Sequence, residues 1–407
     1  MAFVGGTLLP ISTAAIPAGT LVIAGGKIVA IGPVATTPVP DGAERIDATG
    51  KVILPGLVDT HSHVGGGRGG DGSAPVQPDV RILDSINVRD TGFKKCLAGG
   101  LTTLNIMPGS GHLVGGQTVY VKLRPADTID DLLYRDAEGR PLVGLKMANG
   151  TNSQRDAPFP GTRGKSAAIV RQKFLAAAEY RRKMDDPDET KRPARDLELE
   201  ALAECLAGRR IVHHHSHRAD DILTVLRLRE EFGLRVVLHH VSEAWKVPAE
   251  LARAGVPCSV IVLDSPGGKI EAMDMSLATG RVLEAAGVPC SLHTDDPVTD
   301  SRLFLRSAAL AVRAGMSREK ALEAVTLAAA RMLDLDGRIG SLEAGKDADL
   351  VMLSGDPLAV RTKVLETWIE GRKVFDREDP EDLAFAVGGY GTGRDQEAEM
   401  CCAGPNQ

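Results

Sequence analysis

Apolar runs of strand length alternate with amphipathic segments of helix length through most of this 407-residue chain. Such alternation is typical of βα units, in which helices connect parallel strands. The helical segments have an apolar period near 3.6 residues and cover residues 171–183, 197–206, 220–231, 248–254, 276–286 and 302–314. The strand candidates are residues 57–63, 101–107, 118–123, 142–148, 211–217, 235–240, 257–262 and 288–295. Eight such strands predict a (β/α)8 TIM barrel, an α/β fold whose active sites lie at the carboxyl ends of the strands.

The two ends of the chain instead contain short strands separated by tight turns. Residues 20–24 and 28–31 flank a two-glycine turn, and residues 349–354 and 368–375 form a similar pair. Neither end can bury a core alone, so we expect them to pair into one small β-sandwich. The predicted domains are residues 1–55 (first part of the sandwich), 56–345 (barrel), 346–376 (second part of the sandwich) and 377–407 (tail).

Three stretches fit no regular element. Residues 65–73 and 149–164 are rich in glycine, proline and polar residues and follow predicted strands, where substrate loops of barrels lie. The acidic, glycine-containing tail is expected to be disordered or to lie over a neighbouring element.

Composition excludes several classes of partner. A net charge of -6 and an aromatic content of 3% disfavour nucleic-acid binding, which needs clustered cations and stacking rings. No apolar run approaches the roughly 18 residues needed to cross a bilayer, and the first residues do not resemble a secretion signal. We therefore expect a cytoplasmic protein that acts on a small molecule, without a membrane partner. A homo-oligomer is compatible with a barrel, but no sequence feature specifies one.

All ten histidines lie in the strand candidates or in loops beside them. Such clustering predicts a site at the mouth of the barrel. The histidines are His61, His63, His112, His213, His214, His215, His217, His239, His240 and His293.

Strand parity limits which histidines can meet. His61 and His63 are two residues apart, so they share a face and can bind one ion, although such a pair is also found solvated. On the fifth strand, parity places His215 and His217 on the face of His213. At most two of these three can reach one metal, with His215 the first choice and His217 the second. The adjacent His239 and His240 should face opposite ways, so only one should reach the barrel interior.

Asp295 and Lys146 are the other two residues that could bind a metal or take part in the reaction. Asp295 ends an apolar run, where a carboxylate can bind a metal and exchange a proton with a bound water. Its alternative role, capping the next helix, is expected of Asp296 or Asp300. Lys146 lies inside an apolar run, where burial would lower its pKa unless an anion or a metal is near. Alternatively, its ammonium group extends to water.

Taken in order, these residues resemble the amidohydrolase superfamily. The resemblance rests on Pro55 to His63, on the Lys146 strand, on the two later histidine strands and on Thr294-Asp295. A closing signature at residues 321–333 and 340–350 extends it over residues 1–375. Residues 111–117, 144–148 and 217–222 are similar to imidazolonepropionase-like amidohydrolases and their metallo-dipeptidase relatives.

The resemblance implies a binuclear metal centre. Lys146 would be carboxylated by CO2 and bridge two divalent metal ions, zinc first among the metals that suit imidazole and carboxylate ligands. His61, His63 and Asp295 would hold one ion, and His215 and His240 the other. Imidazolonepropionases themselves lack this lysine and use one metal, so Lys146 argues against that reaction. The additional His213, His214 and His239 depart from the family pattern and leave the choice among neighbouring histidines open.

We expect hydrolysis of an amide C–N bond in a small acylamino acid, dipeptide or cyclic amide. A hydroxide bridging the metals would attack the carbonyl, with Asp295 as the catalytic acid and base. His112, His217 and His293 would contact the substrate. Arg218 would hold a substrate carboxylate or, equally, form an ion pair with Asp220 or Asp221. The alternatives are hydrolysis of a lactone, ester or phosphotriester, a deamination at the same metals, or an inactive scaffold.

Overall fold

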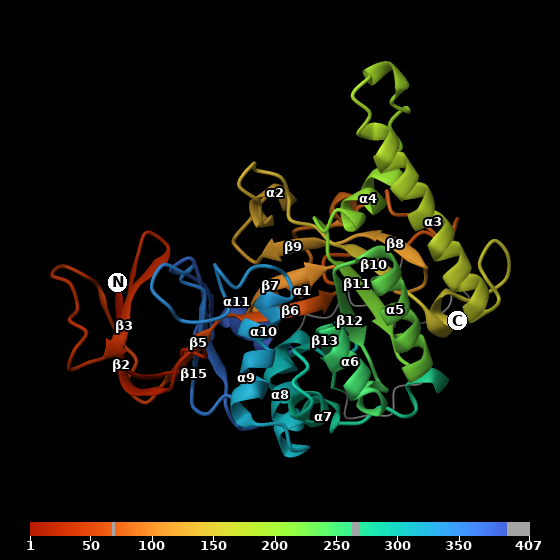
Figure 1. The fold of residues 1–407 in the computed structure, drawn as a ribbon. Helices are drawn as coiled ribbons and strands as arrows, with labels where there is room; N and C mark the ends of the chain where they lie inside the picture. The colour runs from red at the N-terminus through yellow and green to blue at the C-terminus, as the bar shows by residue number, and fades with distance from the viewer. Residues whose placement is uncertain (67–69, 263–268, 389–407) are drawn as a thin grey trace.

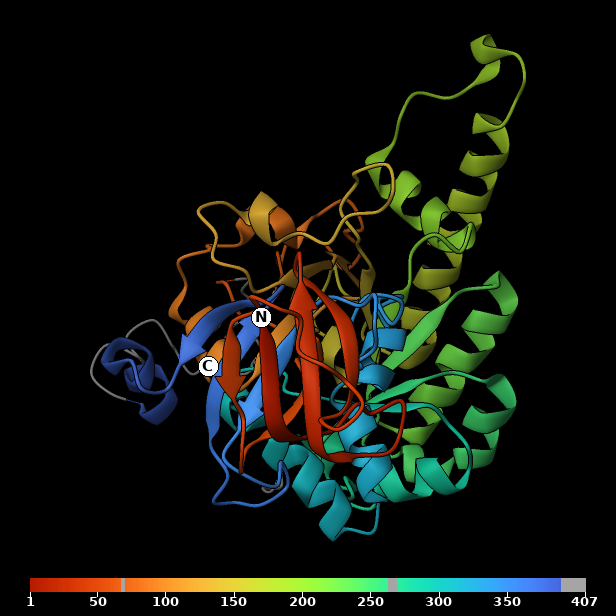
Figure 2. The ribbon, with the colours of Figure 1, turned by 90° about the vertical axis from the view of Figure 1, so that its left-hand side faces the viewer.

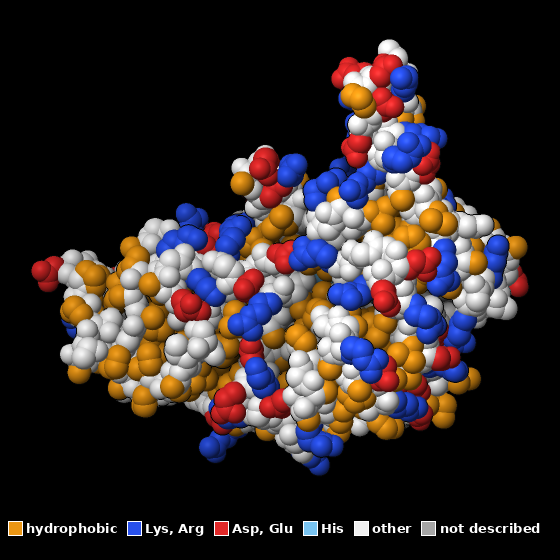
Figure 3. Space-filling model, viewed as in Figure 1, with side chains coloured by type: hydrophobic (Ala, Val, Ile, Leu, Met, Phe, Trp, Pro, Cys, Tyr) orange, Lys and Arg blue, Asp and Glu red, His pale blue; other side chains and the backbone are white. Residues whose placement is uncertain are grey.

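The computed structural model describes residues 1–66, 70–262 and 269–388 and contains a central α/β part and a sheet built from both chain ends (Figure 1). Within these ranges, every helix is too short or too polar to cross a membrane. Basic and acidic side chains are interspersed over the face seen in Figure 3.

Both chain ends contribute strands to one eight-stranded sheet, as Figure 2 shows for the red and blue strands. The predicted glycine turn joins β2 to β3, with φ of 57° at Gly25 and 76° at Gly26, as a two-residue hairpin requires. Pairing of the two ends is thus observed, whereas their arrangement as a sandwich stays a prediction. The sheet order is β17-β16-β15-β5-β1-β2-β3, with β4 beside β1. The strands are β1 (Ala2–Leu8), β2 (Ile16–Ala24), β3 (Lys27–Pro33), β4 (Arg45–Asp47), β5 (Val52–Pro55), β15 (Leu350–Leu353), β16 (Val364–Ile369) and β17 (Arg372–Asp376).

The central strands form a six-stranded sheet, β14-β13-β12-β11-β10-β8, and a three-stranded sheet, β6-β7-β9. The two sheets meet where Ser62 and Asp296 form a parallel bridge. Closure into a barrel stays a prediction, because strand pairing gives two separate sheets. The strands are β6 (Leu57–Ser62), β7 (Leu101–Ile106), β8 (Val114–Gln117), β9 (Val119–Lys122), β10 (Leu145–Ala148), β11 (Val212–Ser216), β12 (Val236–His240), β13 (Cys258–Ile261) and β14 (Cys290–His293).

The third predicted strand, residues 118–123, differs from the regular βα pattern. It corresponds to β9, which runs antiparallel to β7. The preceding strand, β8, runs antiparallel to β10. The segment between Ile106 and Val119 contains β8 but no helix, so the chain returns beside β7 as β9 after a short connection. Such a connection reverses the strand direction, whereas parallel strands need a longer crossover.

The predicted helices are present, and their ends lie within three residues of the predicted ones except at the start of α3, which lies eight residues earlier. Residues 197–206 and 248–254 match α4 and α6, and α3 begins at Arg163 because the Thr162 side chain accepts a hydrogen bond from Lys165 N at 3.2 Å. The longer helices α3 and α5 lie outside the six-stranded sheet (Figure 1). The helices are α1 (Thr91–Ala98), α2 (Ile129–Leu132), α3 (Arg163–Met184), α4 (Leu197–Leu206), α5 (Ala219–Phe232), α6 (Pro248–Ala254), α7 (Thr279–Ala285), α8 (Phe304–Arg313), α9 (Arg318–Ala324), α10 (Leu327–Arg331) and α11 (Pro380–Val387).

Two of the predicted irregular stretches are partly helical. Residues 149–164 contain a 3-10 turn, η2 (Gly150–Ser153), and the start of α3. The tail forms α11, and Lys94 of α1 lies 5.0 Å from the ring centre of Phe385, so this part is ordered over a neighbouring element. The remaining tail residues, 389–407, and residues 67–69 of the first loop lie outside the described ranges.

A buried lysine links the central part to the terminal sheet. Lys122 of β9 places its Nζ 2.5 Å from an Asp347 oxygen and 2.8 Å from an Asp349 oxygen, and all three side chains are buried. These aspartates immediately precede β15. The predicted strand pattern did not reveal this contact, because a lysine at the end of a strand is usually solvated.

Lys122→Met should lower the free energy of unfolding by about 3 kcal/mol, because it removes the cation paired with the buried Asp349 carboxylate, whereas Asp347 keeps its ion pair with Lys27. Urea denaturation would measure the loss. The matched control is Lys320→Met, which removes a surface pair with Glu323 and should cost less than about 1 kcal/mol. Equal losses in the two variants would contradict the assignment of Lys122 as the link between the parts.

Candidate metal centre

His61, His63 and Asp295 meet where β6 and β14 end. Nε2 of His61 lies 3.3 Å from Nε2 of His63 and 3.3 Å from Oδ1 of Asp295, and Nε2 of His63 lies 3.1 Å from the same oxygen. Nδ1 of His63 is 2.8 Å from the carbonyl oxygen of Met107, which orients the ring. Donor atoms of the three side chains lie within 4.8 Å of one another, close enough to hold one ion.

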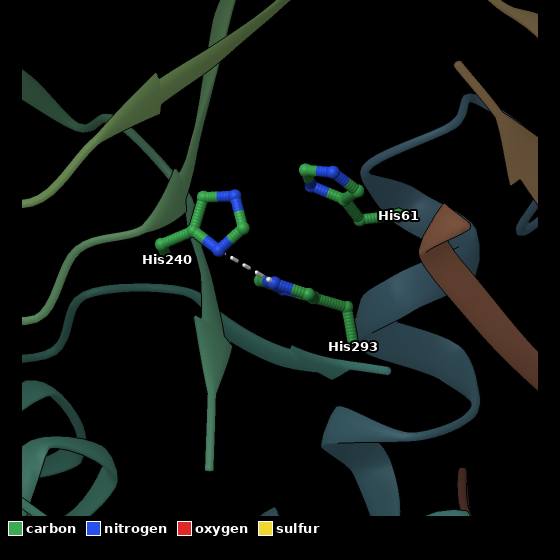
Figure 4. A group of neighbouring side chains, drawn as sticks. All are labelled: His61, His240 and His293. Carbon is green, nitrogen blue, oxygen red and sulfur yellow. Dashed lines mark hydrogen bonds between the residues drawn. The ribbon is translucent and has the colours of Figure 1, made fainter. Parts of the chain in front are cut away.

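A second group consists of His61, His240 and His293 and is shown in Figure 4. Nδ1 of His240 lies 3.3 Å from Nε2 of His293, whose Nδ1 is 2.7 Å from Oγ of Ser259. The sequence predicted that His293 binds substrate. The structure places its ring among the potential metal ligands.

A third group consists of His215, His217 and Glu271. The rings of His215 and His240 have centres 4.2 Å apart, so this group adjoins the second one. Sequence reasoning missed Glu271, which is buried in η5 (Ile270–Ala272), outside every predicted strand and helix. Its Oε2 accepts a hydrogen bond from Thr151 N at 2.8 Å, and no local pattern signals that contact.

Both adjacent histidines of β12 reach the site, which corrects the parity prediction that only one would. Nδ1 of His239 lies 3.3 Å from Nδ1 of His61, and the ring centres of His240 and His61 are 4.7 Å apart. Side chains alternate only while the backbone stays extended. The strand ends at His240 with φ of 68°, followed by Val241 at 43°, and this left-handed bend returns the His240 ring to the site.

Lys146 of β10 is enclosed in the same cluster. Its Nζ lies 3.2 Å from Nε2 of His61 and 3.1 Å from the sulfur of Met107. The residue is 1% exposed, so the alternative in which its ammonium group extends to water is wrong. All six residues predicted to be metal ligands therefore lie in one continuous cluster, in which His63 is partly exposed and the other five are buried.

The histidines of this cluster suit a cation. Burial lowers the pKa of His61, His215 and His240 well below the ordinary value, so each ring is neutral and offers a lone pair. Three of their ring nitrogens, Nδ1 and Nε2 of His215 and Nε2 of His240, have no hydrogen-bond partner among the described residues. Buried polar atoms of this kind are rare, and a metal ion would satisfy them.

Asp59 supports the two strand ends and was missed by the sequence reasoning. One of its oxygens lies 2.5 Å from Oγ1 of Thr294, and the other accepts hydrogen bonds from Thr294 N at 3.2 Å and His61 N at 3.1 Å. Burial raises the pKa of Asp59 to about 7. The next residue after Thr294, Asp295, has a φ of 53°, an unfavourable backbone that these contacts help to fix.

Two of the predicted substrate-binding residues, Arg218 and His112, lie in different parts of the structure. Arg218 lies at the start of α5 and pairs with Asp220 at 2.9 Å, which is its predicted alternative role. His112 is buried against Phe159, with ring centres 5.4 Å apart. The guanidinium group of Arg155 lies over the ring of Phe159, 3.7 Å from the ring centre. Arg155 also donates a hydrogen bond to Gly111 O at 2.6 Å. Among the described residues, no carboxylate forms a salt bridge with Arg155, which the sequence did not single out.

Asp296 and Asp300 have the capping roles predicted for them. Asp296 accepts a hydrogen bond from Ser301 N at 2.9 Å, and Asp300 accepts one from Arg302 N at 2.9 Å.

Comparison with known proteins gives consistent matches. Residues 207–375 match the amidohydrolase family. The chain is 30% identical to the amidohydrolase tasK of Hapsidospora irregularis over 83% of this chain but 38% of that protein, so it spans well under half of tasK. It is 27% identical to an imidazolonepropionase of Caulobacter sp. (strain K31), over 82% of this chain and 87% of that protein.

A solved structure extends the similarity to nearly the whole fold. The crystal structure of an amidohydrolase from Thermotoga maritima MSB8 superposes with a TM-score of 0.86 and 35% sequence identity. The match covers 92% of this chain and 100% of that chain.

Proposed function

Because the chain belongs to the amidohydrolase family, we propose that it is a metal-dependent hydrolase that cleaves an amide C–N bond of a small acylamino acid, dipeptide or cyclic amide. The observation that carries this proposal is the convergence of His61, His63, Asp295 and Lys146 from three different stretches of chain. The similarity to the Thermotoga maritima amidohydrolase also supports closure of the two central sheets into the (β/α)8 barrel.

Two divalent cations, with zinc favoured by the ligands, would bind in this cluster. His61, His63 and Asp295 would hold one, and His215 and His240 the other. Lys146 would be carboxylated, because a buried ammonium beside neutral imidazoles is unfavourable, whereas a carbamate supplies two oxygen ligands. When bound, the cations lower the pKa of a water and polarise the scissile carbonyl.

The chain's own residues would carry the proton and orient the substrate. Asp295 would accept the proton of the attacking water and deliver it to the leaving nitrogen, since its carboxylate faces the centre beside His61 and His63. His217 and His293, whose Nδ1 atoms lie 2.7 Å from Ser242 Oγ and Ser259 Oγ, have fixed rings with which to contact the substrate.

A substrate panel tests the proposed reaction. Zinc-loaded protein should hydrolyse N-acyl amino acids, dipeptides or cyclic amides, and chelation should abolish the activity. Turnover confined to lactones, phosphotriesters or aminopurines would contradict amide hydrolysis while leaving the metal centre intact. A protein that binds no metal would contradict the centre itself.

We place the substrate carboxylate at Arg155 rather than Arg218. Arg218 is already paired with Asp220, whereas Arg155 lies beside Phe159 and His112 without a carboxylate partner among the described residues. Arg155→Met should raise KM for an anionic substrate by about 10- to 100-fold, the loss of a charge-assisted hydrogen bond of about 1.5–3 kcal/mol. Steady-state kinetics would measure it.

Arg218→Met is the matched control and should leave KM within about 3-fold, because an exposed ion pair contributes little. The corresponding amide of the substrate, which lacks the carboxylate, should be insensitive to Arg155→Met. A larger effect of Arg218→Met than of Arg155→Met would return the anion site to Arg218.

A further inference from the structure

Three buried side chains that the proposed reaction does not use form a line behind His61. Tyr120 Oη lies 2.9 Å from His213 Nε2, and His213 Nδ1 lies 2.9 Å from His239 Nε2. His239 Nδ1 in turn lies 3.3 Å from His61 Nδ1. Each of these four residues is at most 3% exposed. We call Tyr120, His213 and His239 the histidine relay.

The hydrogen bonds of the relay can run in only two directions. A neutral imidazole has one N–H donor and one acceptor nitrogen, so fixing one ring fixes the next. In one direction His61 Nδ1–H donates to His239, His239 Nε2–H donates to His213, and His213 Nε2–H donates to the Tyr120 oxygen. In the other, the Tyr120 hydroxyl donates to His213 and each following bond is reversed. A tyrosine hydroxyl can end either arrangement.

Metal binding is compatible with only one of these directions. Nε2 of His61 is the nitrogen that faces His63 and Asp295, so this atom must offer its lone pair to an ion. The proton of His61 is then on Nδ1, where it needs an acceptor. Ligating histidines usually donate this proton to a carboxylate, a carbonyl oxygen or water. Here the acceptor is another imidazole, which accepts only if its own proton is on the far nitrogen.

We propose that the histidine relay positions His61 for metal binding by holding it as the Nδ1–H tautomer. His239 and His213 are then positioning residues, and each carries its proton on Nε2. This inference rests on the proposed metal centre but not on the identity of the substrate. It gives a role to His213 and His239, the two histidines that depart from the family pattern and lie on the line to Tyr120.

Nitrogen-15 NMR of histidine-labelled, zinc-loaded protein tests the direction of the relay. We expect protons on His61 Nδ1, His239 Nε2 and His213 Nε2, with each signal assigned by its absence in a single variant. A proton on the opposite nitrogen of His239 or His213 would overturn the relay even if zinc is bound. This measurement needs no substrate.

Zinc affinity provides an independent readout. His239→Leu removes the acceptor of the His61 proton and should weaken zinc binding by about 10- to 100-fold, as loss of an outer ligand partner does. His239→Asn keeps an acceptor oxygen near the position of Nδ1 and should recover most of the affinity. His214→Leu is the matched control, since His214 is equally buried on β11 but contacts its neighbour's carbonyl oxygen instead of the relay.

The outcomes separate this inference from the proposed function. Equal zinc affinities of His239→Leu and His214→Leu would overturn the relay, and thermal unfolding in chelator would show that both variants fold. Zinc binding with the expected tautomers but without turnover of any amide would overturn the function and leave the relay. Absence of zinc from the unaltered protein would overturn both.

Discussion

Lys146→Ala is expected to lose bound metal and hydrolytic activity together. The side chain is 1% exposed and its Nζ lies 3.2 Å from Nε2 of His61, at the junction of the proposed ligand groups. If its carbamate bridges two ions, removal deprives both of a ligand. The loss in kcat should exceed the 10- to 100-fold that is typical for an outer partner of a metal ligand. Elemental analysis for metal per chain and steady-state kinetics would measure the two effects.

Carbon dioxide distinguishes a carbamate from an unmodified lysine. Metal-free protein reconstituted with zinc in CO2-depleted buffer should gain activity slowly, and bicarbonate should accelerate the gain. In Lys146→Ala, a small carboxylic acid such as propionate should restore part of the metal content, because it can occupy the space of the missing carbamate. Retention of two ions and full activity by Lys146→Ala in plain buffer would exclude Lys146 as the bridge between the ions.

The sequence predicted that the six side chains proposed as metal ligands meet, because its signals are local. His61 and His63 follow the parity of one strand, and Lys146 stands out in an apolar run. Periodicity also located the long helices to within a few residues, apart from the start of α3. A ligand at the end of a regular strand can therefore be inferred from the strand itself.

The rest of the site depends on contacts between distant segments. Glu271 approaches His215 from a 3-10 turn, and Arg155 contacts Gly111 O from an irregular loop, so neither has a periodic pattern to reveal it. Parity failed at His240 because the backbone leaves the extended region there. The antiparallel course of β8 and β9 was also missed, since apolar runs indicate strands but not their direction.

Asp295→Asn is expected to lower kcat by about 100- to 10,000-fold, the usual contribution of a positioned acid or base. The carboxylate oxygen lies 3.3 Å from His61 Nε2 and 3.1 Å from His63 Nε2, so it is near the proposed position of the attacking water. An amide of the same shape can fill that space but cannot accept the proton. Because Asp295 is also a proposed ligand, zinc content must be measured alongside kcat, and the comparison made at saturating zinc.

Asp296→Asn is the matched control on the neighbouring residue. Asp296 is equally buried, but it accepts its hydrogen bond from Ser301 N and caps the following turn. Its substitution should lower stability by about 1 kcal/mol, a usual cost for a weakened cap, and leave kcat within a few fold. A zinc-saturated Asp295→Asn protein with unaltered kcat would assign the proton transfer to another residue. A loss in Asp296→Asn as large as that in Asp295→Asn would show that the fold of this strand end, rather than the Asp295 carboxylate, limits the rate.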